Sequence, residues 1–209
     1  GAGHSPSRAG ASRGAIGVTT FNDGASYFSN FRYRADDTLV FPPAPPMWER
    51  PGAITRWEVS QVYKASQFDS DLLLATPDLP KPEWHSAAAE PDGTVNLSRT
   101  CRRDGAAPAA VLARTTLRAD APRTMKLGLG YSDYVYVFLN GRLLFSGNSA
   151  YTSRDPSFLG ILGPFDTVYL PLTAGDNELT LLVVEVMGGW GFLCLDGDAV
   201  FTTAGVTAA

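Results

Sequence analysis

The sequence has few cysteines, few histidines and no surplus of basic residues, and each shortage excludes a class of protein. Its two cysteines, Cys101 and Cys194, are too few for a disulfide scaffold, and their spacing fits no zinc motif. They can form one disulfide in an oxidising compartment or remain two buried thiols. With 17 basic and 21 acidic residues, the net charge is −4, so no basic excess is present to neutralise nucleic-acid phosphates. We therefore expect no nucleic-acid partner.

Long apolar runs are also missing. The apolar run over residues 179–187 is interrupted by Glu185, whereas a membrane-spanning helix needs roughly 18 uninterrupted apolar residues. We expect no membrane span. The first residues lack methionine and the apolar segment of a signal peptide, so we expect the N-terminus to be processed, truncated or artificial.

Groups suited to catalysis are scarce. Only two histidines occur, His4 in a small polar segment and His85 beside Trp84, and no G-x-S-x-G motif accompanies them. A pair of carboxylates for glycoside hydrolysis cannot be located from the sequence, because its definition is a distance across a cleft. The sequence therefore predicts a protein that is not an enzyme.

Turn-forming residues are abundant, with 21 glycines and 15 prolines, and this favours short strands over long helices. Alternating or continuous apolar runs predict about eight strands and no helix, which is typical of an antiparallel β-sandwich. Within residues 111–118, Arg114 and Arg118 fall on the face opposite the apolar residues. Asn140-Gly141 predicts a type I′ turn between two strands. The nine candidate runs behind this count cover residues 54–65, 84–97, 111–118, 133–139, 142–145, 167–172, 178–186, 192–195 and 199–202.

Changes in composition divide the chain into segments. A β-hairpin is predicted around Asn22-Asp23-Gly24, with strands over residues 14–20 and 25–34. The prolines that follow it predict an extended linker. The predicted organisation is a tail (1–13), the hairpin (14–36), a Pro-rich linker (37–53), the β-sandwich (54–203) and a second tail (204–209).

Two patterns carry a resemblance to a known family. They are V-x-V-x-L-N-G at residues 135–141 and L-x-x-G-x-N-x-L at residues 172–179, followed by Gly-Gly-Trp-Gly-Phe at residues 188–192. Together they resemble the galactose-binding-like β-sandwich (jelly-roll) domains, which occur as carbohydrate-binding modules and as accessory domains of glycosidases. The resemblance covers residues 54–202. It implies a non-catalytic carbohydrate-binding module of a larger secreted protein, in an extracellular or periplasmic location.

Residues 14–34 are similar to the closing hairpin of concanavalin-like or laminin-G-like lectin domains, in which G-x-I-G precedes an aromatic strand of the type Y-F-x-N-F. This likeness implies that the chain is the C-terminal part of a longer extracellular protein. The alternative is that the hairpin adds to the sandwich. Two other functions stay open: an accessory domain that packs against other domains or subunits, and a glycan-active hydrolase or lyase.

Sugar recognition needs an aromatic face and polar groups for the hydroxyls. The loop residues that supply them are Trp84, Tyr151, Arg154, Asp155 and Trp190, with Tyr134 as a further candidate. Trp190 lies among glycines that allow close backbone approach, but a large aromatic beside strands is more often part of a core. We keep both interpretations of Trp190.

Acidic residues suggest two further roles. The predicted metal ligands are loop aspartates: Asp69, Asp71, Asp196 and Asp198. The family resemblance implies a structural calcium ion there, and the alternative is that they are ordinary turn residues. Glu185, in an apolar strand, can be an acid, a metal ligand or the partner of an arginine such as Arg114 or Arg142, and we favour the arginine partner.

Overall fold

The computed structural model describes residues 29–34, 49–68, 80–103, 107–150, 153 and 162–198. The chain divides into two units, Gly1–Pro43 and Ala44–Ala209. In the first unit the described residues form no strand, although the sequence predicted one there. Asn30 has a φ of 58°, in the left-handed region, which interrupts an extended backbone. The other parts of the predicted hairpin, and the predicted strand over residues 199–202, lie outside the described residues.

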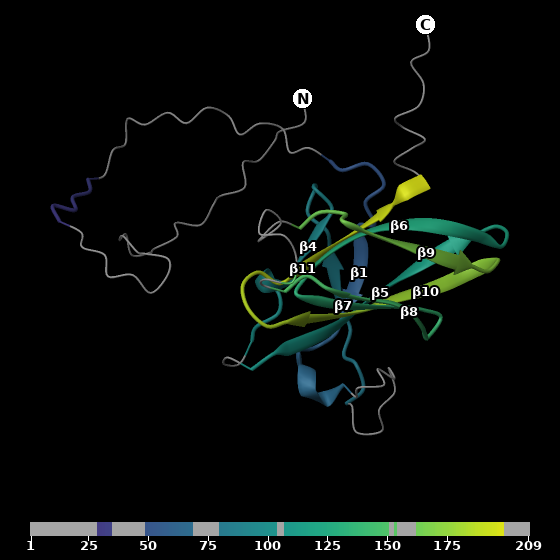
Figure 1. Cartoon of the computed structure of the whole chain (residues 1–209), viewed down its shortest axis with the longest axis horizontal. Coiled ribbons are helices and arrows are strands. Elements are labelled where there is room, and N and C mark those ends of the chain that lie inside the picture. The colour runs from purple at the N-terminus through teal and green to yellow at the C-terminus, as the bar shows by residue number, and fades with distance from the viewer. Residues whose placement is uncertain are drawn as a thin grey trace, which may run out of the picture. The chain divides into compact units, whose positions relative to one another are not determined.

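The second unit is an antiparallel β-sandwich, as the sequence predicted (Figure 1). Its larger sheet has the strand order β3-β1-β5-β10-β7-β8, with β2 paired to β5, and its smaller sheet has the order β4-β11-β6-β9. The strands of the larger sheet are β1 (Arg56–Val59), β2 (Tyr63–Lys64), β3 (His85–Ala88), β5 (Ala109–Ala119), β7 (Tyr134–Leu139), β8 (Arg142–Asn148) and β10 (Gly175–Glu185). Those of the smaller sheet are β4 (Thr94–Asn96), β6 (Arg123–Ser132), β9 (Asp166–Leu172) and β11 (Gly191–Asp196).

The main core fills the space between the two sheets. Val111 and Leu181 of the larger sheet and Leu129 and Phe192 of the smaller one are all completely buried. Trp57 meets the Phe192 ring edge-on, with 4.8 Å between ring centroids. Side chains alternate between the two faces of a strand, so the same strands present their other residues outward. No helix among the described residues is long and apolar enough to cross a membrane.

The central hairpin agrees with its prediction in detail. Asn140 and Gly141 have φ values of 50° and 78°, and positive φ at both central positions is what a type I′ turn requires. The turn joins β7 to β8. Gly141 accepts this conformation without the cost that a β-carbon would add.

Three strand predictions differ from the structure. Residues 54–65 form β1 and β2 and then enter a 3-10 turn, η1 (Ala65–Gln67). Strand β1 ends at Val59, next to buried Ser60, whose hydroxyl accepts from the Leu112 backbone N–H. Residues 84–97 contribute β3 to one sheet and β4 to the other, before the 3-10 turn η2 (Leu97–Arg99). The sequence prediction also missed β6 altogether, although β6 pairs with both β9 and β11.

The glycines of β6 explain why it was missed. Gly128 and Gly130 stand at outward positions where a polar residue would have marked a half-buried strand. Their missing side chains make room for residues 163–164, which cross the strand there: a β-carbon on Gly130 would overlap the backbone of Gly163. The lack of side chains at these glycines therefore has two effects: it removes the alternating pattern that would have predicted the strand, and it lets residues 163–164 cross β6.

Gly130→Ala is expected to lower the free energy of unfolding by about 2 kcal/mol, because overpacking forces the backbone to shift. Gly189→Ala is the matched control: nothing lies within 4 Å of its added β-carbon, and we expect a change within about 0.5 kcal/mol. Urea titration of both variants measures the difference. Equal stability would contradict the close crossing of residues 163–164 over β6.

Candidate functional site

Polar side chains form a row across the outer face of the larger sheet. Ser86 of β3 lies opposite Glu58 of β1, which lies opposite Arg114 of β5. Arg114 in turn lies opposite Thr180 of β10. The odd-numbered residues of β5 face the core, so its even-numbered residues face outward. This confirms the face that the sequence predicted for Arg114.

Arg114 connects three side chains of this face. Its Nε donates to Glu58 Oε2 at 2.8 Å, and its guanidinium lies 3.8 Å from Glu178 Oε2. The guanidinium carbon also stands 4.1 Å from the centroid of the Trp84 ring. Ion pairs as exposed as these contribute roughly 0–1 kcal/mol each to stability. The main effect of the arrangement is to fix where the two carboxylates stand.

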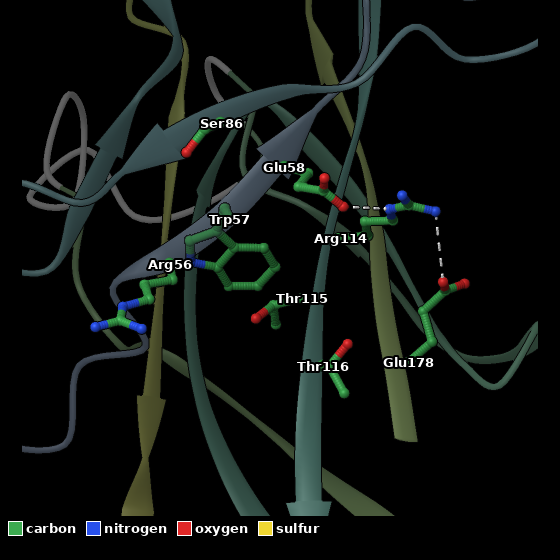
Figure 2. Close-up of a pocket in the computed structure, with 8 residues that line it drawn as sticks. All are labelled: Arg56, Trp57, Glu58, Ser86, Arg114, Thr115, Thr116 and Glu178. Atoms are coloured by element: carbon green, nitrogen blue, oxygen red, sulfur yellow. Dashed lines mark hydrogen bonds and ion pairs between the residues drawn. The ribbon is translucent and has the colours of Figure 1, made fainter. Parts of the chain in front are cut away.

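A pocket of about 470 Å³ opens beside Arg114 (Figure 2). It exists because β1 pairs with β5 only through Glu58 and Val59, so the strands separate at the start of β1. The volume falls in the range of about 300–1,000 Å³ that is usual for small-molecule sites. The described residues that line it are Arg56, Trp57, Glu58, Ser86, Arg114, Thr115, Thr116 and Glu178.

The groups around the pocket suit a ligand rich in hydroxyls. The Glu58 and Glu178 side chains are about half exposed and accept hydrogen bonds, whereas Arg114 donates them. The hydroxyls of Ser86 and Thr116 both donate and accept. Trp57 also lines the pocket but is only 3% exposed, so it does not present an open aromatic face. Recognition here would rest on polar contacts more than on stacking.

The structure places the predicted sugar ligands differently from one another. Trp84 is half-buried and adjoins the pocket through Arg114. Trp190 is 3% exposed and belongs to the main core, which corresponds to the second interpretation of this residue. Tyr151, Arg154 and Asp155 lie outside the described residues. Tyr134, the further candidate, is half-buried on β7.

The predicted metal ligands have other partners where they are described. Asp196 accepts a hydrogen bond from the Asp198 backbone N–H at 3.0 Å, and Asp198 forms an ion pair with Arg123 at 3.3 Å. Asp69 and Asp71 lie outside the described residues. Within the described ranges, no three His, Cys, Asp or Glu side chains gather as a metal site would need. A structural calcium ion stays a prediction.

Glu185 is the partner of an arginine, but of neither arginine that the sequence suggested. It is 1% exposed, and its Oε1 accepts from Arg103 Nη1 at 3.1 Å. Buried Asp133 lies nearby and accepts two backbone N–H groups just after β10, those of Val186 and Met187. Burial raises the pKa of the Glu185 carboxyl above its ordinary value, Asp133 raises it further, and Arg103 opposes the rise.

Both cysteines are free thiols in the structure, so no disulfide joins them, and the second alternative of two buried thiols holds for Cys194 only. Cys194 is fully buried in the main core, and Cys101 is half-buried. Burial raises the pKa of both thiols, so neither is activated as a nucleophile.

Sequence reasoning did not identify Arg56, Glu58 or Glu178 as site residues. The available signal was the alternation of β1, in which Arg56 and Glu58 flank a buried tryptophan. Glu58 and Arg114 are 56 positions apart, however, and their pairing depends on the order of strands in the sheet. Local patterns carry no information about that order.

No protein-family model and no curated protein matches the chain. Among solved structures it is similar to a beta-glucosidase from Kluyveromyces marxianus, with 13% identity and a TM-score of 0.43 over 70% of this chain and 17% of the enzyme. It is also similar to a GH31 alpha-xylosidase from Xanthomonas citri, with 11% identity and a TM-score of 0.41 over 73% of this chain and 16% of the enzyme. For the PA14 domain of the antifreeze protein MpAFP, the identity is 12% and the TM-score is 0.36, over 76% of this chain and 89% of that domain. The chain thus spans less than a fifth of these glycosidases, and scores this low add nothing on function.

Proposed function

We propose that the β-sandwich is a non-catalytic carbohydrate-binding module of a larger secreted protein. The observation that supports this is the pocket beside Arg114, where two half-exposed carboxylates, a guanidinium and several hydroxyls converge. Such groups match the hydroxyls of a sugar, which both donate and accept hydrogen bonds. The sequence resemblance to galactose-binding-like domains supports the same proposal.

A glycan-array screen of the whole chain, run with calcium and again with a chelator, tests the proposal. Saturable binding to a defined glycan would support it. Sensitivity to the chelator would support the proposed calcium ion, and would direct attention to the predicted loop aspartates. Silence across a broad array would contradict the proposal.

Glu58→Gln is expected to weaken glycan binding about tenfold or more, because a hydrogen bond to a charged acceptor is worth about 1.5–3 kcal/mol. Glu178→Gln should act in the same direction, since Glu178 lies on the other side of Arg114. Isothermal titration calorimetry with the best glycan from the array measures both affinities.

The matched control for these variants is Asp176→Asn. Asp176 is an exposed carboxylate that also pairs with an arginine, Arg118, at 4.0 Å, but it does not line the pocket. It should leave the affinity unchanged. An unaltered affinity in both glutamate variants would place the sugar elsewhere, and Arg154→Ala would then test the predicted loop ligands.

A second function, an accessory domain that packs against another domain or subunit, has one observation in its favour. Phe165 and Tyr169 are 42% and 63% exposed, and Tyr169 lies on β9, an edge strand of the smaller sheet. An exposed aromatic surface at a sheet edge is a common feature of interaction sites. Silence on the glycan array, combined with concentration-dependent association in light scattering, would favour this function.

A further inference from the structure

We propose that the pocket beside Arg114 binds an acidic sugar, a hexuronate, whose carboxylate is held by Arg56. The inference rests on the proposed carbohydrate-binding function and adds the chemical class of the ligand. It follows from how charge is distributed along the pocket.

The two arginines of the pocket differ in their partners. Arg114 is flanked by Glu58 and Glu178, so its charge is already compensated and that side of the pocket carries a net negative charge. Arg56 is exposed, and among the described residues no carboxylate forms an ion pair with it. The pocket therefore has a positive side at Arg56 and a negative side at the two glutamates.

The backbone of β1 sets the spacing of the residues at these two sides. Arg56 and Glu58 lie two residues apart on the same face of β1, so their Cα atoms are about 7 Å apart along the strand. The cross-strand neighbour of Arg56 is Ala88, whose methyl group cannot compete for the guanidinium. Figure 2 shows Arg56 and Arg114 on opposite sides of the Trp57 indole.

A single hexuronate ring matches this arrangement. Its carboxylate would accept two parallel hydrogen bonds from the planar guanidinium of Arg56. The hydroxyls on the other side of the ring would donate to Glu58 and Glu178, which need hydrogen-bond donors. A neutral sugar would meet the glutamates equally well but would leave Arg56 without a role in binding.

The experiment compares oligosaccharides that end in glucuronate, galacturonate or mannuronate with the methyl esters of the same compounds. Esterification removes the charge and keeps the ring, so the ratio of the two affinities isolates the carboxylate. Isothermal titration calorimetry on the full chain should show the acid form of at least one sugar binding about tenfold more tightly than its ester. The preference should weaken with added salt.

Arg56→Gln should bring the ratio of the two affinities close to one, because it weakens binding of the acid form much more than binding of the ester. Arg118→Gln is the matched control. Arg118 is an exposed arginine on the outer face of the same sheet, on β5, but it does not line the pocket. The ratio should survive in that variant.

The possible outcomes distinguish a failure of the hexuronate inference from a failure of the proposed sugar-binding function. If acid and ester bind equally well, or the preference persists in Arg56→Gln, the inference is wrong and the sugar-binding function stands. If a sulfated sugar of the same ring binds more tightly than the uronate, the ligand class is wrong. If no sugar binds in any form, the proposed function itself is wrong.

Discussion

Arg103→Met is expected to lower the free energy of unfolding by about 3 kcal/mol at about pH 8, because it removes the partner of a buried charge. Arg103 Nη1 stands 3.1 Å from Oε1 of Glu185, and Glu185 is 1% exposed. The other carboxylate oxygen, Oε2, is buried without a hydrogen-bond partner. Without the guanidinium, the ionised carboxylate would be left in an apolar strand beside the carboxylate of Asp133.

The size of this effect should depend on pH. The folded protein raises the pKa of Glu185 above its ordinary value of 4.5, so folding favours the protonated form. The contribution of Glu185 to stability is therefore greatest below 4.5 and falls as the pH rises toward the raised pKa. Loss of Arg103 raises this pKa further, so the fall extends to higher pH. The variant should differ less from the parent at acidic pH than at about pH 8.

Urea titrations at both pH values test the prediction. The double variant Arg103→Met with Glu185→Gln should regain most of the stability at about pH 8, because no unpaired charge remains. Arg118→Met is the surface control: its ion pair with Asp176 is largely exposed on both sides, and we expect a loss within about 0.5 kcal/mol. A pH-independent loss in Arg103→Met would contradict a role in compensating the charge of Glu185.

The fold was largely predictable because most of its strands carry their own local signal. The hairpin of β7 and β8 has an apolar run, a turn that only a few residue types allow, and a returning strand. β10 is a long apolar strand bounded by turn residues. Strand β6 was not predicted, because its glycines are required by the crossing of residues 163–164, which are more than 30 positions away in the sequence.

The candidate site was less predictable, because its residues come together only when the strands are ordered. The sequence could place Arg114 on an exposed face, but it could not show that Glu58 and Glu178 would lie on either side of it. Glu185 shows the same limit: the need for an arginine partner followed from its apolar surroundings, whereas Arg103 comes from a loop 82 positions away. The local sequence indicated which side chain needs a charged partner, whereas the fold determined which residue is that partner.

The resemblance motifs proved informative about the fold for a structural reason. In the L-x-x-G-x-N-x-L pattern, Asn177 is completely buried, and its side chain joins the Asn140 turn to the turn before β10. Its Oδ1 accepts from Asn140 and from the backbone N–H of Thr173, and its Nδ2 donates to the Thr173 and Gly175 carbonyls. These motif residues therefore stabilise the arrangement of the strands, and the choice of ligand depends on other residues.

Asn177→Asp is expected to lower the free energy of unfolding by about 3 kcal/mol at neutral pH, although it changes the side-chain volume very little. The new oxygen would face the carbonyl oxygens of Thr173 and Gly175, which now accept from the amide, and a buried carboxylate would lack a cation. At acidic pH the carboxyl can bind a proton and donate one hydrogen bond, so the loss should become smaller. Urea titration at neutral and acidic pH measures both effects.

Asn148→Asp is the matched control for this substitution. The Asn148 side chain is exposed and uses only its oxygen, which accepts from the Ala150 backbone N–H at 3.0 Å, and an aspartate preserves that bond. We expect a change within about 0.5 kcal/mol. If Asn177→Asp were as well tolerated as this control, the donor role of the Asn177 amide would be wrong. The spacing of the motif would then reflect the backbone conformation of the turn alone. The strands would be stabilised by their backbone hydrogen bonds and by the packing of the core, without a contribution from the buried amide.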